Sequence, residues 1–145
     1  MNAYSGKLQD IMETFALLDS WEERYRYLID LGRALPAMAE AEKTEETRVQ
    51  GCVSQVWMVA HIDADGIFHL KADSDAHIVH GLIAILHAAC EGLPVAEVAA
   101  LDFEALFADL GLEDNLSPNR RNGFYAMVQR VKALARAAEG AGRAG

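Results

Sequence analysis

The sequence predicts an α+β fold in which a small antiparallel sheet, of about three strands, packs with several helices. Apolar residues recur at steps of three and four over several segments, which is the spacing of amphipathic helices. Between those segments lie one β-branched and aromatic run from Val53 to Ile62 and a second from Ile67 to Lys71. The intervening Asp63-Ala64-Asp65-Gly66 is typical of a hairpin turn, so the two runs predict paired strands.

Two helices are expected before the sheet. Apolar residues from Leu8 to Leu18 form one face of the first helix, with Ser5 as a candidate cap. Ser20 and Glu23 have the spacing of a capping box, which predicts a second helix beginning near Trp21. This helix stops at Pro36, and the acidic residues 37–47 predict a solvated loop with room for a helical turn.

Four helices are expected after the sheet. Asp73-Ser74-Asp75 supplies cap residues for a long helix that is apolar around most of its girth, so this helix is expected to be central and buried. Pro94 begins a short helix, and Asp102 caps the next. The last helix opens at Ser117-Pro118, a hydroxyl cap followed by proline in the first turn.

The sequence indicates one domain over residues 1–138, followed by a glycine-rich tail at 139–145 that we expect to be disordered. No internal repeat and no linker suggests a second domain. A short piece at residues 48–49 is expected to pair beside the hairpin as the third strand.

Composition narrows the class of protein. The 145 residues suffice for a real core, and the net charge of -9 argues against a nucleic-acid partner. We find neither an apolar signal core near the N-terminus nor a window approaching a membrane span, so no membrane association is expected. Cys52 and Cys90 do not form a disulfide framework. We therefore expect a cytoplasmic protein in which both thiols are free.

The stretch from Arg48 to Trp57 joins a turn to a strand and carries a candidate reactive thiol. Gly51 permits a sharp turn directly before Cys52, and a cysteine on a turn anchored by a strand suits sulfur chemistry. From these residues alone, the alternative is a small buried thiol. Cys90, near the end of an apolar helix, is expected to fill the core.

A metal site formed by histidines is an alternative to the reactive-thiol interpretation. His77, His80 and His87 have spacings that allow one helical face to present three imidazoles. Neither Cys-x-x-Cys nor His-Glu-x-x-His accompanies them, so we predict no metal site. Two other functions remain open: a metal- or cluster-binding scaffold with Cys/His ligands, and a free-standing thiol enzyme.

The motif around Cys52 resembles that of the SufE-type sulfur acceptor proteins, a family that also includes CsdE. Other stretches match in family order between about residues 20 and 135. The matching stretches are Trp21–Tyr25, Leu31–Pro36, Gly51–Trp57, Asp73–Leu82 and Leu116–Gly123.

This resemblance implies a fold shared with U-type iron–sulfur scaffold proteins and a role for Cys52. The cysteine would accept sulfane sulfur as a persulfide from a cysteine desulfurase of the SufS or CsdA type. It would thereby stimulate that enzyme and pass the sulfur to a downstream scaffold for iron–sulfur cluster assembly. Pyridoxal phosphate belongs to the desulfurase, so no cofactor is expected here. The resemblance implies an accessory sulfur-transfer protein, monomeric or homodimeric, rather than a stand-alone enzyme.

The resemblance also implies supporting residues. Asp75 and Arg120 match family residues associated with the region that faces the partner. The other residues expected to bind the partner or support the loop are Gly51, Ser54 and Gln55.

The chemistry of a sulfur carrier predicts a loop with two positions. Cys52 must reach a donor persulfide, yet the loaded sulfur gains from shelter because persulfides oxidise and exchange readily. We expect the loop to lie inward in the free protein and outward in the complex, with Gly51 as the hinge. Val53, Val56 and Trp57 are expected to line the inward shelter.

Overall fold

The computed structural model describes residues 6–52 and 54–144, and in this part of the chain six α-helices accompany a two-stranded antiparallel sheet. The α+β class predicted from the sequence is confirmed. The elements follow in the order α1 (Gly6–Leu17), α2 (Trp21–Arg33), the 3₁₀ turn η1 (Glu40–Glu42), β1 (Val56–Ile62), β2 (Phe68–Ser74), α3 (His77–Cys90), α4 (Val95–Ala100), α5 (Phe103–Asp109) and α6 (Pro118–Ala144).

The sheet is the predicted hairpin. Its register pairs Val56 with Ser74 at one end and Ile62 with Phe68 at the other. Gly66 has a φ of 79°, in the left-handed region that glycine adopts at low steric cost, so the Asp-Gly turn forms as expected.

The predicted third strand is reduced to one bridge, which corrects the expected strand count for the described residues. Arg48 forms an isolated antiparallel bridge with Trp57. The Val49 N–H donates to the Val56 carbonyl and the Met58 N–H donates to the Thr47 carbonyl, both at 2.8 Å. Directly after Val49 the chain turns away at Gly51, so the pairing cannot extend into a strand.

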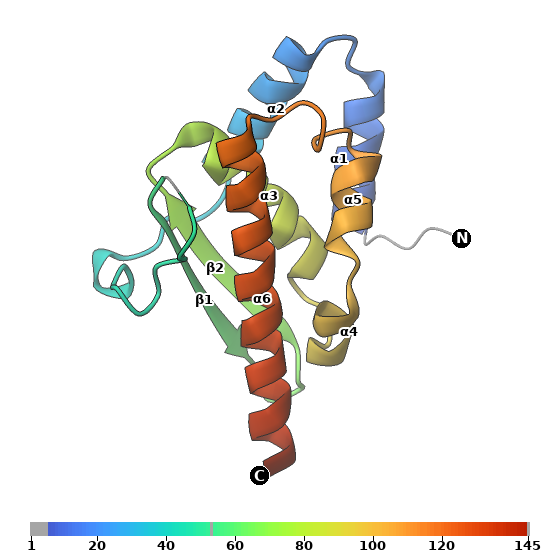
Figure 1. The fold of residues 1–145 in the computed structure, drawn as a ribbon. Helices are drawn as coiled ribbons and strands as arrows, with labels where there is room; N and C mark the ends of the chain where they lie inside the picture. Colours follow the sequence, from blue (N-terminus) through green and yellow to red (C-terminus); the bar gives the residue numbers. More distant parts are fainter. Residues whose placement is uncertain (1–5, 53, 145) are drawn as a thin grey trace.

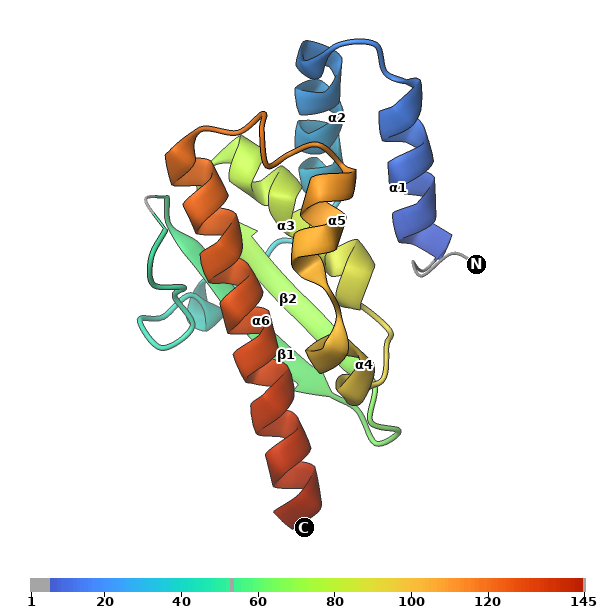
Figure 2. The same ribbon diagram turned by 45° about the vertical axis from the view of Figure 1, so that its right-hand side comes forward.

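The helices lie on one side of the sheet (Figures 1 and 2), with α3 packed on β2 and α6 packed on β1. The strand residues that alternate toward these helices are buried: Val56, Met58, Phe68, Leu70 and Ala72. They join the apolar faces of α3 and α6 in one hydrophobic core. This core fixes the position of α6 relative to the segment that enters β1.

The other face of the sheet is covered near its end by the segment that contains η1 (Figure 1). Lys43 lies 5.2 Å from the centroid of the Trp57 ring, and its Nζ is 3.2 Å from Asp73 Oδ2. The Met38 N–H also donates to Asp73 Oδ2, at 3.3 Å. The loop predicted for residues 37–47, with its helical turn, therefore shields a buried carboxylate.

Helix α3 is central, as predicted from the apolar residues on most of its sides, and its backbone lies very close to that of α2. A Cβ atom on Gly81 would lie 2.4 Å from the Leu28 carbonyl oxygen, and one on Gly32 would lie 2.8 Å from the Gly81 nitrogen. The two backbones can be this close only because both positions are glycine.

The start of α3 differs from the prediction. Asp73 and Ser74 still belong to β2, and the helix begins at His77 with Ala76 as N-cap and no side-chain cap. The polar residues before α3 are engaged elsewhere: the Ser74 hydroxyl donates to the Gln55 carbonyl at 2.7 Å, and the Asp75 carboxylate accepts from the Gln55 N–H at 3.1 Å. Tertiary contacts with the chain before β1 therefore replace the expected capping.

The other helix boundaries largely follow their caps. The Ser20 hydroxyl accepts from the Glu23 N–H at 3.2 Å, and the Asp102 carboxylate accepts from the Ala105 N–H at 3.0 Å. Ser5, the candidate cap of α1, lies outside the described residues.

Helix α6 also differs from the prediction, because it continues through residues 139–144, where the sequence predicts a disordered tail. Alanine is the strongest helix former, and the alanines of this stretch offset the weak propensity of Gly140 and Gly142. The helix therefore runs on beyond the sheet (Figure 1). None of the helices described is both long and apolar enough for a membrane crossing.

Candidate functional site

Cys52 lies at the tip of a narrow loop whose two ends are joined. Val49 and Val56 are connected by a backbone hydrogen bond of 2.8 Å, so residues 50–55 form a closed tip. Gly51 has a φ of 91°, which favours glycine strongly over residues with a side chain. The sharp turn predicted before the cysteine is confirmed, and it directs Cys52 toward helix α6.

The Cys52 thiol contacts the backbone of α6. Its Sγ donates to the Gly123 carbonyl oxygen at 3.5 Å, across 71 residues of chain. A Cβ on Gly123 would lie 3.7 Å from that sulfur, an ordinary contact distance, so the sulfur rests on the helix backbone. Partial burial raises the pKa of the Cys52 thiol, because desolvation disfavours the thiolate. In this position partial burial favours the protonated form of the thiol over the thiolate.

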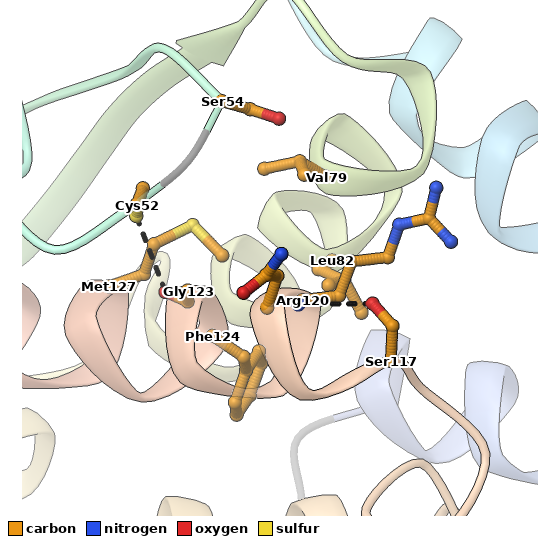
Figure 3. Close-up of a pocket in the computed structure, with 10 residues that line it drawn as sticks. Cys52, Ser54, Val79, Leu82, Ser117, Arg120, Gly123, Phe124 and Met127 are labelled. Atoms are coloured by element: carbon orange, nitrogen blue, oxygen red, sulfur yellow. Dashed lines mark hydrogen bonds between the residues drawn. The ribbon is translucent and has the colours of Figure 1, made fainter.

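The thiol faces a pocket of about 390 Å³ between the loop, α3 and α6 (Figure 3). Val79 and Leu82 of α3 form one wall, and Phe124 and Met127 of α6 contribute another apolar wall. Polar side chains complete the lining, from Ser54 on the loop and from Ser117, Asn119 and Arg120 at the start of α6.

Three hydrogen bonds anchor the loop where it re-enters the sheet. The Gln55 N–H donates to Asp75 Oδ1 at 3.1 Å. The Gln55 carbonyl accepts from the Ser74 hydroxyl at 2.7 Å and from the Asp75 N–H at 3.3 Å. We call Gln55, Ser74 and Asp75 the loop anchor. Asp75 thus supports the loop through its carboxylate while its side chain lies at the exposed surface.

Arg120 is exposed at the edge of the pocket. Its backbone N–H donates to the Ser117 hydroxyl at 3.3 Å, which fixes the first turn of α6. Its guanidinium group points away from Cys52 (Figure 3).

The structure brings most of the predicted site residues around one opening. Cys52, Ser54 and Arg120 line the pocket, and Gly51 shapes the turn. The Gln55 side chain is exposed, and the contribution of this residue comes from its backbone in the loop anchor.

The predicted shelter has different walls. Val56 is fully buried on the core face of β1, while Trp57 points to the opposite face, against Lys43. Neither lines the pocket, because strand alternation sends one into the core and the other away from α6. Val53, the third expected residue, lies outside the described residues.

On the α6 side of the pocket, the sequence predicted Arg120 as a site residue but not Gly123 or Met127. Gly123 and Met127 are four residues apart and lie on one helical face, a spacing that identifies neighbours on a helix. The four-residue spacing is visible in the sequence, but nothing local indicates that this face lies against Cys52.

Cys90 is not a second site thiol. It is completely buried in the core, and burial raises its pKa to about 12. Its expected role as core filler is confirmed by its burial.

The histidines of α3 do not gather into a metal site. His80 Nε2 lies 3.5 Å from Asp73 Oδ1, whereas His87 Nε2 lies 3.5 Å from Glu91 Oε1. Within the described ranges, no group of three or more His, Cys, Asp or Glu residues is placed to hold a metal ion.

Comparisons with known proteins agree on one family. The SufE family model, described as an Fe-S metabolism associated domain, matches residues 9–135. An uncharacterised SufE-like protein of Rhizobium etli is 48% identical over 132 residues, covering 89% of both chains. A second, from Rhizobium meliloti, is 44% identical over 131 residues, covering 88% of this chain and 94% of the relative. The solution structure of a hypothetical protein from Thermus thermophilus superimposes with a TM-score of 0.75 at 25% identity, covering 91% of this chain and 95% of that one.

Proposed function

This chain belongs to the SufE family, which places it in iron–sulfur metabolism, and we propose that it carries sulfane sulfur as a persulfide on Cys52. The observation that supports this most directly is the position of Cys52 at a loop tip, facing a pocket large enough for an added sulfur atom. The donor in this proposal is the active-site persulfide of a cysteine desulfurase of the SufS or CsdA type.

The transfer is a thiol exchange at sulfur. The Cys52 thiol loses its proton and the resulting thiolate attacks the terminal sulfur of the donor persulfide. A new sulfur–sulfur bond forms to Cys52, the donor's own sulfur–sulfur bond breaks, and the donor cysteine leaves as a thiolate that takes up a proton. No net oxidation occurs, and pyridoxal phosphate acts only in the desulfurase.

The raised pKa of Cys52 explains why the thiol would be a weak nucleophile in the inward position. In the pocket, burial favours the protonated form, which is the weak nucleophile. When the loop swings outward at Gly51, hydration favours the thiolate and exposes it to the donor. The same movement out of the pocket would therefore favour the thiolate and bring it to the donor persulfide.

The same pocket protects the loaded state. Val79, Leu82, Phe124 and Met127 supply apolar walls that keep water and small oxidants from the terminal sulfur. Ser117 and Asn119 add polar groups to the lining of the cavity. We infer that the persulfide returns inward after loading and is then delivered to an iron–sulfur scaffold.

Asp75 and Arg120 are the proposed partner contacts. Both are exposed: Asp75 belongs to the loop anchor and Arg120 lines the pocket. Charges at such a rim steer docking and fix orientation.

Removal of sulfur from the donor by Cys52 would free the desulfurase for another cycle, which accounts for the expected stimulation. Both cysteines are free thiols, in keeping with action in the cytoplasm.

Intact-mass analysis after incubation with a cysteine desulfurase and cysteine tests the proposal. We expect one or more added sulfur atoms on Cys52, removed by reductant. Cys52→Ser should lose both loading and desulfurase stimulation, whereas the control Cys90→Ser should keep both. Full stimulation by Cys52→Ser would refute the carrier function.

A further inference from the structure

One face of α6 runs along the whole segment that leads to Cys52. Gly123, Ala126, Met127 and Arg130 follow at steps of three and four and so lie on one side of the helix. The Gly123 carbonyl oxygen accepts a hydrogen bond from the Cys52 thiol, and Met127 lines the pocket. A Cβ on Gly51 would lie 3.4 Å from the Ala126 Cβ, so the turn itself rests on this face.

Arg130 extends this contact to the chain before the loop. Its Nη2 donates to the Glu46 carbonyl oxygen at 2.7 Å, across 84 residues of sequence. The Nε of the same side chain is buried without a hydrogen-bond partner among the described residues, so this side of the guanidinium group is shielded from water. A charged donor at this distance makes one of the stronger kinds of protein hydrogen bond.

The loop therefore has two differently held arms. The arm after Cys52 is tied to the end of β2 by the loop anchor at Gln55. The arm before Cys52 is tied to α6 through Arg130 and Glu46. Both arms are thus held in this structure, and the position of Cys52 against Gly123 depends on the first arm staying against α6.

We propose that Arg130 is a positioning residue that keeps this first arm on α6 and thereby holds Cys52 inward against Gly123. The inference rests on the proposed sulfur-carrier function for its biological meaning, but its physical content concerns the free protein alone. Without the Arg130 hydrogen bond, the arm separates from α6 more often and the thiol spends more time outside the pocket.

The test is the rate at which a bulky maleimide alkylates Cys52 in the isolated protein, in a Cys90→Ser background that leaves one thiol. Arg130→Met keeps an unbranched apolar stem and removes the donors. Hydrogen bonds to charged groups contribute enough to shift such an equilibrium about tenfold, so we expect alkylation about tenfold faster than in the parent. An unchanged rate would overturn the proposal.

Two controls separate positioning from loss of stability or of charge. Arg24→Met removes the same kind of contact elsewhere, since Arg24 donates to the Phe15 and Leu18 carbonyls at 3.1 and 3.0 Å. It should leave the alkylation rate unchanged. Glu46→Ala should also leave it unchanged, because the acceptor is a backbone carbonyl that alanine retains. A rise in either control equal to that of Arg130→Met would overturn the proposal.

A conservative replacement and a second readout complete the design. Arg130→Lys restores one charged donor and should return the rate toward that of the parent; a rate equal to that of Arg130→Met would contradict the hydrogen-bond explanation. In protein loaded by a desulfurase, Arg130→Met should lose persulfide sulfur to a small reductant faster than the parent. Failure of loading itself would refute the carrier function and leave the alkylation result, which needs no desulfurase, to decide the role of Arg130.

Discussion

Replacement of Asp75 separates support of the loop from contact with a partner. The residue is not a helix cap, since α3 begins at His77 with Ala76 as N-cap. Its carboxylate instead accepts one of the three hydrogen bonds of the loop anchor, from the Gln55 N–H at 3.1 Å. Asp75→Ala removes this bond and the charge, whereas Asp75→Asn removes the charge and keeps an acceptor oxygen.

The expected size of the effect follows from that single bond. An exposed hydrogen bond contributes about 1 kcal/mol, which corresponds to about a fivefold change in a local opening equilibrium. In Asp75→Ala, the Gln55 amide should therefore exchange its hydrogen about fivefold faster, while Asp75→Asn should change exchange by less than about twofold. The remaining anchor bonds, from the Ser74 hydroxyl and the Asp75 N–H, are retained in both variants.

Hydrogen exchange of the free protein, combined with sulfur transfer from a desulfurase, gives two independent readouts. If the carboxylate also meets the partner, Asp75→Asn should slow transfer although its loop exchanges almost normally. Normal transfer in Asp75→Asn with slow transfer in Asp75→Ala would assign the residue to loop support alone. Unchanged exchange at Gln55 in Asp75→Ala would refute the loop anchor itself.

Two further predictions concern stability. His69 lies between Asp63 and Glu91, and its pKa is raised mainly by the hydrogen bond to Asp63 and next by that to Glu91. Because the charged imidazole is favoured in the folded state, these contacts stabilise the fold. Their contribution is complete below the ordinary histidine pKa of about 6.5 and is lost as pH rises through the raised pKa. Urea midpoints should show wild type exceeding His69→Gln at pH 5.5 by more than at pH 9, and a gap independent of pH would contradict the assignment. Gly81→Ala should lower stability by about 3 kcal/mol, because its Cβ would lie 2.4 Å from an α2 carbonyl oxygen, whereas Gly6→Ala, with nothing within 4 Å, should not destabilise the fold. A Gly81→Ala protein with an unchanged urea midpoint would show that α2 and α3 separate at little cost.

Sequence patterns were sufficient to predict the helix starts and the turn that depend only on neighbouring residues. Ser20 and Asp102 cap their helices, and the turn ending at Gly66 closes the hairpin, as their side chains or backbone preferences require. The same reasoning failed at Asp73-Ser74-Asp75, where a cap-rich sequence continues a strand. There, hydrogen bonds to Gln55 outweigh the capping preference, and no local pattern reveals a partner about 20 residues away.

The candidate site shows the same division. Gly51 and Cys52 could be identified from a turn and a strand, because both features lie within ten residues. The pocket walls could not, since Val79, Phe124 and Met127 had the pattern of ordinary core residues and only the packing of α3 and α6 brings them to the thiol. The Arg130 contact is still more remote, because it joins a helix side chain to a backbone carbonyl.

The reactivity of Cys52 depends most on these long-range contacts. A cysteine on a glycine turn, considered alone, suggests an exposed thiol, yet in its position against Gly123 the thiol is partly buried, and this burial raises its pKa. A carrier whose loaded persulfide rested in the open would lose its terminal sulfur to small thiols or have it oxidised. Because α6 supplies both the acceptor for the thiol and the wall of the pocket, the inward loop would be protected and inactive at once. Under the proposed carrier function, a partner that drew the loop outward would both expose the sulfur and restore its nucleophilicity, and it would have to compete with the contacts made by α6.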